Sequence, residues 1–235
     1  MHILGTLLKL INISKMHLIK IKNKIQKFNK VLSIEGDKSL SIRWALIASQ
    51  SKSKSRSINL LLSEDVINTL KCLRKLGVKM NISKNFCEIN GVGLNGFKYK
   101  ENLILDAGNS GTLGRLILGL LIHSENKIKL KGDRSLSKRD FLRIIKPLKK
   151  FGANFKSNYG KLPIAIKGTK NASPIFYNET RGSAQVKSSV MLAALNTSGE
   201  TIIKAKKSRN HSELLFRHLK LPIKIQRKKN YDLIK

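Results

Sequence analysis

Two segments of the chain repeat apolar residues at steps of three and four positions, the pattern of an amphipathic helix. The apolar positions are Val66, Ile67, Leu70, Leu73 and Leu76 in the first segment, and Phe141, Leu142, Ile145, Leu148 and Phe151 in the second. Each segment ends at a glycine, Gly77 or Gly152, which predicts the end of a helix. Residues 81–93 and 155–168 follow and read as strand–turn–strand hairpins.

These helices belong to a longer repeat that occurs three times, over residues 41–80, 114–155 and 187–225. Each copy opens with a helix rich in small and apolar residues, which predicts burial on all sides. A short strand follows (SINL, KIKL or TIIK), then the amphipathic helix and further strand. Residues 17–25 alternate apolar and polar positions, which predicts another strand. The pattern therefore predicts an α/β fold with pseudo-threefold packing of its repeats.

The composition allows a large hydrophobic core and shows a strong excess of positive charge. Hydrophobic residues make up 41% of the 235 residues, and the formal net charge is +33. Nucleic acid is the first partner to consider for such a charge. However, the lysines are scattered and aromatic residues are only 6%. We therefore favour compositional drift, with small anionic substrates as a further reason for the charge. No apolar run has the length of a membrane span, and the two cysteines, Cys72 and Cys87, form no metal motif.

The starts of the three buried helices share a chemical character. They read GDKSLSIR, DAGNSGTLGR and RGSAQVKS, each with glycine, hydroxyl and basic residues. A helix N-terminus offers free N–H groups and a positive dipole end, which suits an anion. If the repeats are symmetric, these starts converge, and the converging charges are Lys38, Arg43, Arg115 and Lys187, with Arg139 as a further contributor. Alternatively, Ser39, Asn109 and Ser183 are simple N-caps, and Arg115 and Lys187 are solvated or paired.

Five segments together resemble one enzyme family. They are GDKSLSIR, GNSGT, GDRSLSKRD, GSAQVKSSVMLAAL and SRNHSELL, within residues 20–225. Their order and sequence resemble motifs of the 5-enolpyruvylshikimate-3-phosphate synthase family. The resemblance implies a domain of three βαβαββ units, an inside-out α/β barrel. It also implies transfer of the enolpyruvyl group of phosphoenolpyruvate to the 5-hydroxyl of shikimate 3-phosphate, in the shikimate pathway to chorismate.

The resemblance also implies binding residues for both substrates. For shikimate 3-phosphate they are Lys38, Ser39, Arg43, Ser183, Ala184, Gln185 and Arg209. For phosphoenolpyruvate they are Lys38, Asn109, Gly111, Thr112, Arg139 and Gln185. The resemblance implies no metal or other cofactor, a monomer and a cytoplasmic location. The sequence departs from the family at Ile42, Asp140, Asn210 and Ser212, and we expect Asp140 to weaken the pull of Arg139.

Length is the largest departure, because members of the family are about twice as long. We expect residues 1–15 to be a non-native extension, with Met16 as the natural start. Residues 16–235 then form a single enolpyruvyl transferase domain, and the second domain of the family is missing. The catalytic acid and base belong to that second domain, so no residue is assigned to either role. We expect little activity from the chain alone.

Three alternatives stay open. The first is an enolpyruvyl transferase that acts on UDP-N-acetylglucosamine, which shares the fold but carries a reactive cysteine in a mobile loop. Cys72 in a helix and Cys87 in a strand do not match that pattern. The second is a basic nucleic-acid-binding module, whose binding would fall steeply with salt. The third is a noncatalytic remnant that folds without function.

Overall fold

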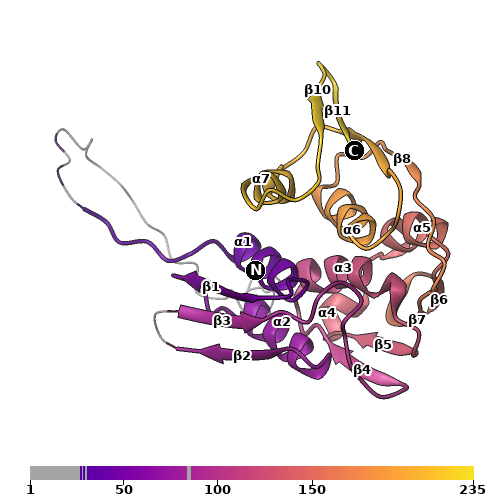
Figure 1. The fold of residues 1–235 in the computed structure, drawn as a ribbon, viewed down its shortest axis with the longest axis horizontal. Coiled ribbons are helices and arrows are strands. Elements are labelled where there is room, and N and C mark those ends of the chain that lie inside the picture. Colours follow the sequence, from indigo (N-terminus) through magenta and orange to yellow (C-terminus); the bar gives the residue numbers. More distant parts are fainter. Residues whose placement is uncertain (1–26, 28, 30, 84–85) are drawn as a thin grey trace, which may run out of the picture. The chain divides into compact units, whose positions relative to one another are not determined.

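The computed structural model describes residues 27, 29, 31–83 and 86–235 (Figure 1). The chain divides into two compact units, residues 1–34 and 35–235, and the fold described below is that of the second. The strand predicted at residues 17–25 lies outside the described residues. Within the described part of the chain, no helix is long and apolar enough to cross a membrane.

The first repeat contains two helices and a three-stranded antiparallel sheet. Its elements are α1 (Lys38–Ala48), β1 (Lys54–Ile58), α2 (Glu64–Lys75), β2 (Lys79–Ile82) and β3 (Phe86–Asn90). The strand order is β1-β3-β2, and β2 and β3 form the predicted hairpin. The sequence predicted the strand that corresponds to β1 at residues 57–60, three residues too far along the chain. Strand β1 begins at Lys54, which pairs with Asn90 of β3.

The second and third repeats have the same topology as each other. The second comprises β4 (Leu103–Asp106), α3 (Gly111–Leu120), β5 (Ile128–Lys131), α4 (Arg134–Ser137), α5 (Leu142–Lys150), β6 (Asn154–Asn158) and β7 (Lys161–Lys167), with η2 (Leu121–His123) after α3. The third comprises β8 (Phe176–Glu179), α6 (Ala184–Ala194), β9 (Ile202–Lys206), α7 (His211–His218), β10 (Ile225–Arg227) and β11 (Tyr231–Ile234). The strand orders β4-β5-β7-β6 and β8-β9-β11-β10 are equivalent. In both sheets the first two strands are parallel and the other pairs antiparallel, which confirms the predicted repeat for these two copies.

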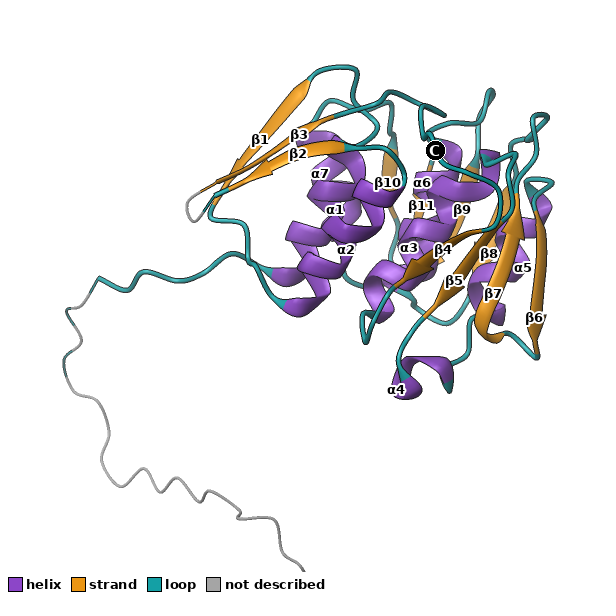
Figure 2. Cartoon of the chain, turned by 90° about the horizontal axis from the view of Figure 1, so that it is seen from below, coloured by secondary structure: helices purple, strands orange, loops and turns teal. Residues whose placement is uncertain are grey.

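The three small-residue helices form the centre of this unit, with the sheets outside them (Figure 2). In α3 every residue except Thr112 is buried, and this includes the charged residue Arg115. Helices α1 and α6 are likewise buried over most of their length. The predicted burial of these helices is therefore confirmed. The amphipathic helices α2 and α5 end before Gly77 and Gly152, whose φ angles are +89° and +105°.

Candidate anion-binding site

The N-terminus of α1 carries the first group of predicted site residues. Asp37 caps the helix, because its carboxylate accepts a hydrogen bond from the amide of Leu40 at 2.7 Å. Ser39 is therefore not the N-cap. Lys38 is exposed, and its ammonium group forms an ion pair with Asp65 of α2 at 2.9 Å. Because Asp37 caps the N-terminus of α1, the side chains of Lys38 and Ser39 are not needed as caps.

Asp65 connects the start of α1 to the start of α3. Ser110, the N-cap of α3, accepts a hydrogen bond from the amide of Leu113 and donates one to Asp65. Burial alone would raise the pKa of Asp65, but the hydrogen bonds from Ser110 and Lys38 and the charges of Lys38 and Arg139 outweigh it. The net result is a lowered pKa. Lys38, Ser110 and Arg139 thus surround one carboxylate, although they come from three elements.

Helix α6 joins the same group through Gln185. Ser183 caps this helix by accepting from the amide of Val186, so the alternative interpretation of Ser183 as an N-cap is correct in geometry. Gln185 accepts a hydrogen bond from Arg115 Nη1 at 2.8 Å and donates one to Thr112 Oγ1 at 3.2 Å. The first turns of α3 and α6 are therefore bonded to each other through side chains.

Arg139 approaches the start of α3 from the loop after α4. Its Nη2 donates to Asn109 Oδ1 at 3.4 Å, and Asn109 Nδ2 donates to Asp133 at 2.6 Å. Gly111 makes this approach possible. A Cβ atom at that position would lie 2.8 Å from Nη1 of Arg115 and 3.2 Å from Nη1 of Arg139. The missing side chain therefore leaves the space in which two guanidinium groups meet the helix N-terminus.

The site gathers arginine side chains that form no direct ion pair with a carboxylate among the described residues. Burial lowers the pKa of Arg43, Glu213 opposes this shift, and the charge of Arg209 lowers the pKa further, so Arg209 lies near Arg43. Burial also lowers the pKa of Arg115 to about 10, and the charges of Arg143 and Arg139 contribute in the same direction. Within the described residues, none of these five arginines forms an ion pair with a carboxylate. Such a cluster suits a ligand with several negative charges.

One predicted contributor is not in this cluster. Lys187 is fully buried and forms a direct ion pair with Glu213 of α7, so the expectation that its charge faces the site is wrong. It points from α6 toward α7, where Glu213 lies. Asp140 accepts a hydrogen bond from the amide of Leu142 at 2.7 Å at the start of α5. Its expected effect on the pull of Arg139 stays a prediction.

Sequence reasoning missed the residues that support the predicted ones. Asp65 forms an ion pair with Lys38, and Ser110 caps α3. Asp133 accepts a hydrogen bond from Asn109. Asp65 looked like an ordinary acidic residue in the first turn of a helix, which complements the helix dipole. Ser110 could have been found, because it is the serine directly before the apolar run of α3.

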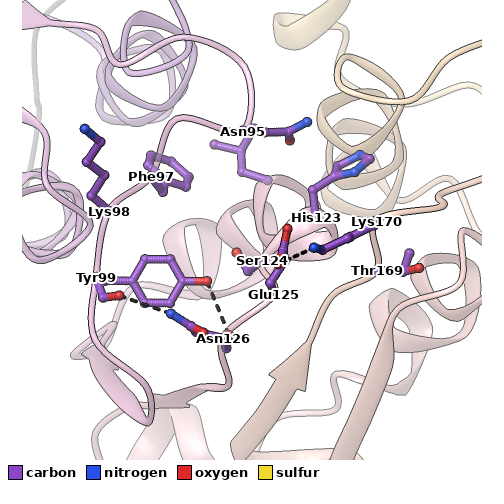
Figure 3. Close-up of a pocket in the computed structure, with 11 residues that line it drawn as sticks. Asn95, Phe97, Lys98, Tyr99, His123, Ser124, Glu125, Asn126, Thr169 and Lys170 are labelled. Atoms are coloured by element: carbon purple, nitrogen blue, oxygen red, sulfur yellow. Dashed lines mark hydrogen bonds and ion pairs between the residues drawn. The ribbon is translucent and has the colours of Figure 1, made fainter.

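A cavity of about 540 Å³ lies at the opposite end of α3 (Figure 3). Its lining includes Tyr99 and His123 and contains none of the predicted site residues. Several of its polar groups bond to each other: Tyr99 donates to the carbonyl of Asn126 at 3.2 Å, and Lys170 pairs with Glu125 at 3.1 Å. We therefore place the candidate site at the N-termini of the three buried helices.

A repeated α/β unit of this topology, with cationic side chains gathered at its helix starts, is typical of the enolpyruvyl transferase class of fold. The family model described as EPSP synthase (3-phosphoshikimate 1-carboxyvinyltransferase) matches residues 22–235. The chain belongs to this family.

Individual relatives agree with the family match. The chain is 42% identical over 199 residues to 3-phosphoshikimate 1-carboxyvinyltransferase of Ruthia magnifica, covering 84% of this chain and 46% of the relative. It is 39% identical over 202 residues to the Streptococcus agalactiae protein of the same name, covering 85% and 47%. An EPSP synthase structure from Acinetobacter baumannii superposes with a TM-score of 0.78 at 33% identity, over 86% of this chain and 46% of that one. The chain therefore spans about half the length of these relatives.

Proposed function

We propose that this chain binds shikimate 3-phosphate and phosphoenolpyruvate and forms one half of the site that transfers the enolpyruvyl group between them. The products are 5-enolpyruvylshikimate 3-phosphate and phosphate. The observation that carries the proposal is the convergence of three helix N-termini on a cluster of arginines without carboxylate partners among the described residues. Two substrates that each carry a phosphate and a carboxylate need such a cluster.

Each predicted residue has a role in this proposal. Arg43, Ser183 and Arg209 bind shikimate 3-phosphate, together with Ser39, Ala184 and Gln185. Asn109, Gly111, Thr112 and Arg139 bind phosphoenolpyruvate, and Lys38 and Gln185 contact both substrates. The cations then stabilise negative charge in the tetrahedral addition intermediate, because they are fixed before the reaction begins. The site also holds the two reacting groups in a fixed relative orientation.

We propose that the chain alone turns over little substrate. No residue of the cluster is assigned as the base for the 5-hydroxyl or the acid for the methylene carbon. In this proposal both groups come from the part of the enzyme that the longer relatives have beyond the matched region. We also propose that the chain is a monomer, which sedimentation of the purified chain tests, and that it acts in the cytoplasm.

Isothermal titration with shikimate 3-phosphate, with and without phosphoenolpyruvate, tests the proposal. We expect saturable binding that is lost in Lys38→Ala and retained in Lys156→Ala, which removes an exposed lysine of the edge strand β6. Equal loss in both variants would indicate a general charge effect and contradict the proposal. Binding of UDP-N-acetylglucosamine in preference, or of DNA with steep salt dependence, would favour the alternatives. A folded wild-type chain that binds neither shikimate 3-phosphate nor phosphoenolpyruvate would refute the proposed function.

A further inference from the structure

Oxygen atoms of uncharged groups hold the guanidinium group of Arg43 in place. Its Nε donates to Ser212 Oγ of α7 at 2.8 Å, and its Nη2 donates to Ser188 Oγ of α6 at 3.2 Å. Its Nη1 donates to the carbonyl of Ser39 at 3.1 Å, one turn earlier in α1. Arg43 is only 5% exposed, so these contacts, rather than water, determine where the guanidinium lies.

The two serine hydroxyls can only act as acceptors toward Arg43, and this fixes the direction of every hydrogen bond. Ser188 Oγ donates its single proton to the carbonyl of Ala184 at 2.6 Å. The contact between Ser188 and Ser212, also 2.6 Å, must then use the proton of Ser212. Donation therefore runs one way, from Arg43 through Ser212 and Ser188 to Ala184. Helix α7 is thus connected to the first turn of α6 through Ser212 and Ser188, which also accept hydrogen bonds from Arg43.

This arrangement leaves part of the guanidinium group for a ligand. An arginine has five N–H donors, and three bonds to described residues use one donor on each nitrogen. One donor remains on each of the two terminal nitrogens. Two such donors match the two oxygens of a carboxylate or a phosphate.

We propose that Ser212, supported by Ser188, is a positioning residue that presents these two remaining donors of Arg43 to the anionic substrate. This inference rests on the proposed function, in which Arg43 binds shikimate 3-phosphate. Ser212 acts through Arg43 and touches no substrate. It lies in the SRNHSELL segment, where the sequence departs from the family pattern, and its hydroxyl group supplies what the arrangement requires.

The position of Ser212 is itself fixed by its neighbour in α7. Glu213 is 3% exposed and forms a direct ion pair with the buried Lys187 of α6. The carboxylate of Glu213 also opposes the lowering of the pKa of Arg43, so it lies close to the arginine. The first turn of α7 therefore docks on α6 by a charged contact and on α1 by a hydroxyl contact.

Titration of five variants with shikimate 3-phosphate tests the positioning role. Ser212→Thr and Ser212→Val have the same shape and differ only in the hydroxyl group. We expect Ser212→Thr to bind within about twofold of the wild type and Ser212→Val to bind about tenfold more weakly, the effect of one charged hydrogen bond. Ser49→Ala removes another fully buried hydroxyl, at the far end of α1, and should leave binding unchanged. In Arg43→Ala, adding Ser212→Val should have no further effect on binding.

Equal binding by the threonine and valine variants would overturn the proposal, as would an undiminished effect of Ser212→Val in the Arg43→Ala background. A purely structural role would lower the thermal midpoint of Ser212→Val without changing its affinity. A binding-independent readout separates this inference from the proposed function. If the wild type binds no shikimate 3-phosphate, the proposed function fails, but NMR still detects the Nε–H group of Arg43. We expect a resonance protected from solvent exchange in the wild type and Ser212→Thr, and unprotected in Ser212→Val. An unprotected wild-type resonance would refute the positioning role.

Discussion

Neutralising Glu213 should destabilise the chain more than neutralising its partner Lys187. The side chain of Glu213 is 4% exposed and that of Lys187 is 1% exposed, so water solvates neither charge. Arg43 is a second buried cation near the same carboxylate. Glu213→Gln therefore leaves two buried positive charges without the carboxylate that lies beside both of them. Lys187→Met leaves one carboxylate beside one guanidinium group, which is still a balanced pair.

The charges that remain in each variant give the magnitudes. Removing one partner of a buried ion pair costs about 3–5 kcal/mol, because the other charge stays buried without compensation. We expect this full cost for Glu213→Gln. For Lys187→Met we expect about 2 kcal/mol, close to one hydrogen bond to a charged group. For a chain of this size, the larger cost corresponds to a fall of roughly 10–15 °C in the thermal midpoint.

Urea denaturation of both variants and of the double variant measures these free energies of unfolding. The slope with denaturant should stay constant, so that the midpoints report stability alone. We expect the double variant to be less destabilised than the sum of the single variants, because the two residues interact. Additive effects, or a larger cost for Lys187→Met than for Glu213→Gln, would show that charge balance around Arg43 does not determine the stability of this contact.

Three further predictions concern other parts of the chain. Gly111→Ala should weaken phosphoenolpyruvate binding about tenfold, because its Cβ would displace two guanidinium ends, and calorimetry that finds unchanged affinity would contradict this. The lowered pKa of Asp65 stabilises the fold above the ordinary pKa of aspartate, about 4, and this contribution is lost as the pH falls further. Asp65→Asn should therefore lose more stability at pH 7 than at pH 3, and an equal loss at both pH values in urea titrations would refute the argument. Burial raises the pKa of the Cys72 and Cys87 thiols to about 11. Neither should react with Ellman's reagent at pH 8 until the chain is unfolded, and rapid reaction of the native chain would disprove this.

The repeat could be predicted from the sequence because hydrophobic periodicity reports burial directly. The apolar surroundings of Arg115 indicated a helix buried on all sides, and the structure has that helix. Strand β1 was placed too late because its residues, from Lys54 to Ile58, are mostly polar on both faces and owe their conformation to pairing with β3. Local pattern carries no information about such a partner.

The segments at the starts of α1, α3 and α6 could be grouped from the sequence because they occupy equivalent positions of a repeat. The individual residues Asn109, Gly111 and Gln185 were then chosen from the family resemblance. Lys187 was assigned to the same group from its spacing, but the choice between the site and a buried partner depends on Glu213, which lies 26 residues later in the chain. Roles toward substrates stay predictions for all of the proposed binding residues.

The repeated topology also limits what can distinguish one substrate from another. Backbone amides at the starts of α1, α3 and α6 present nearly the same donors three times around one region. A ligand without threefold symmetry obtains no preferred orientation from such a scaffold. Orientation must come from the differences between the copies: a lysine at the start of α1, a glycine at the start of α3 and a glutamine at the start of α6. We therefore expect discrimination between anionic ligands to depend on a few side chains, and the scaffold to add only a general affinity for anions.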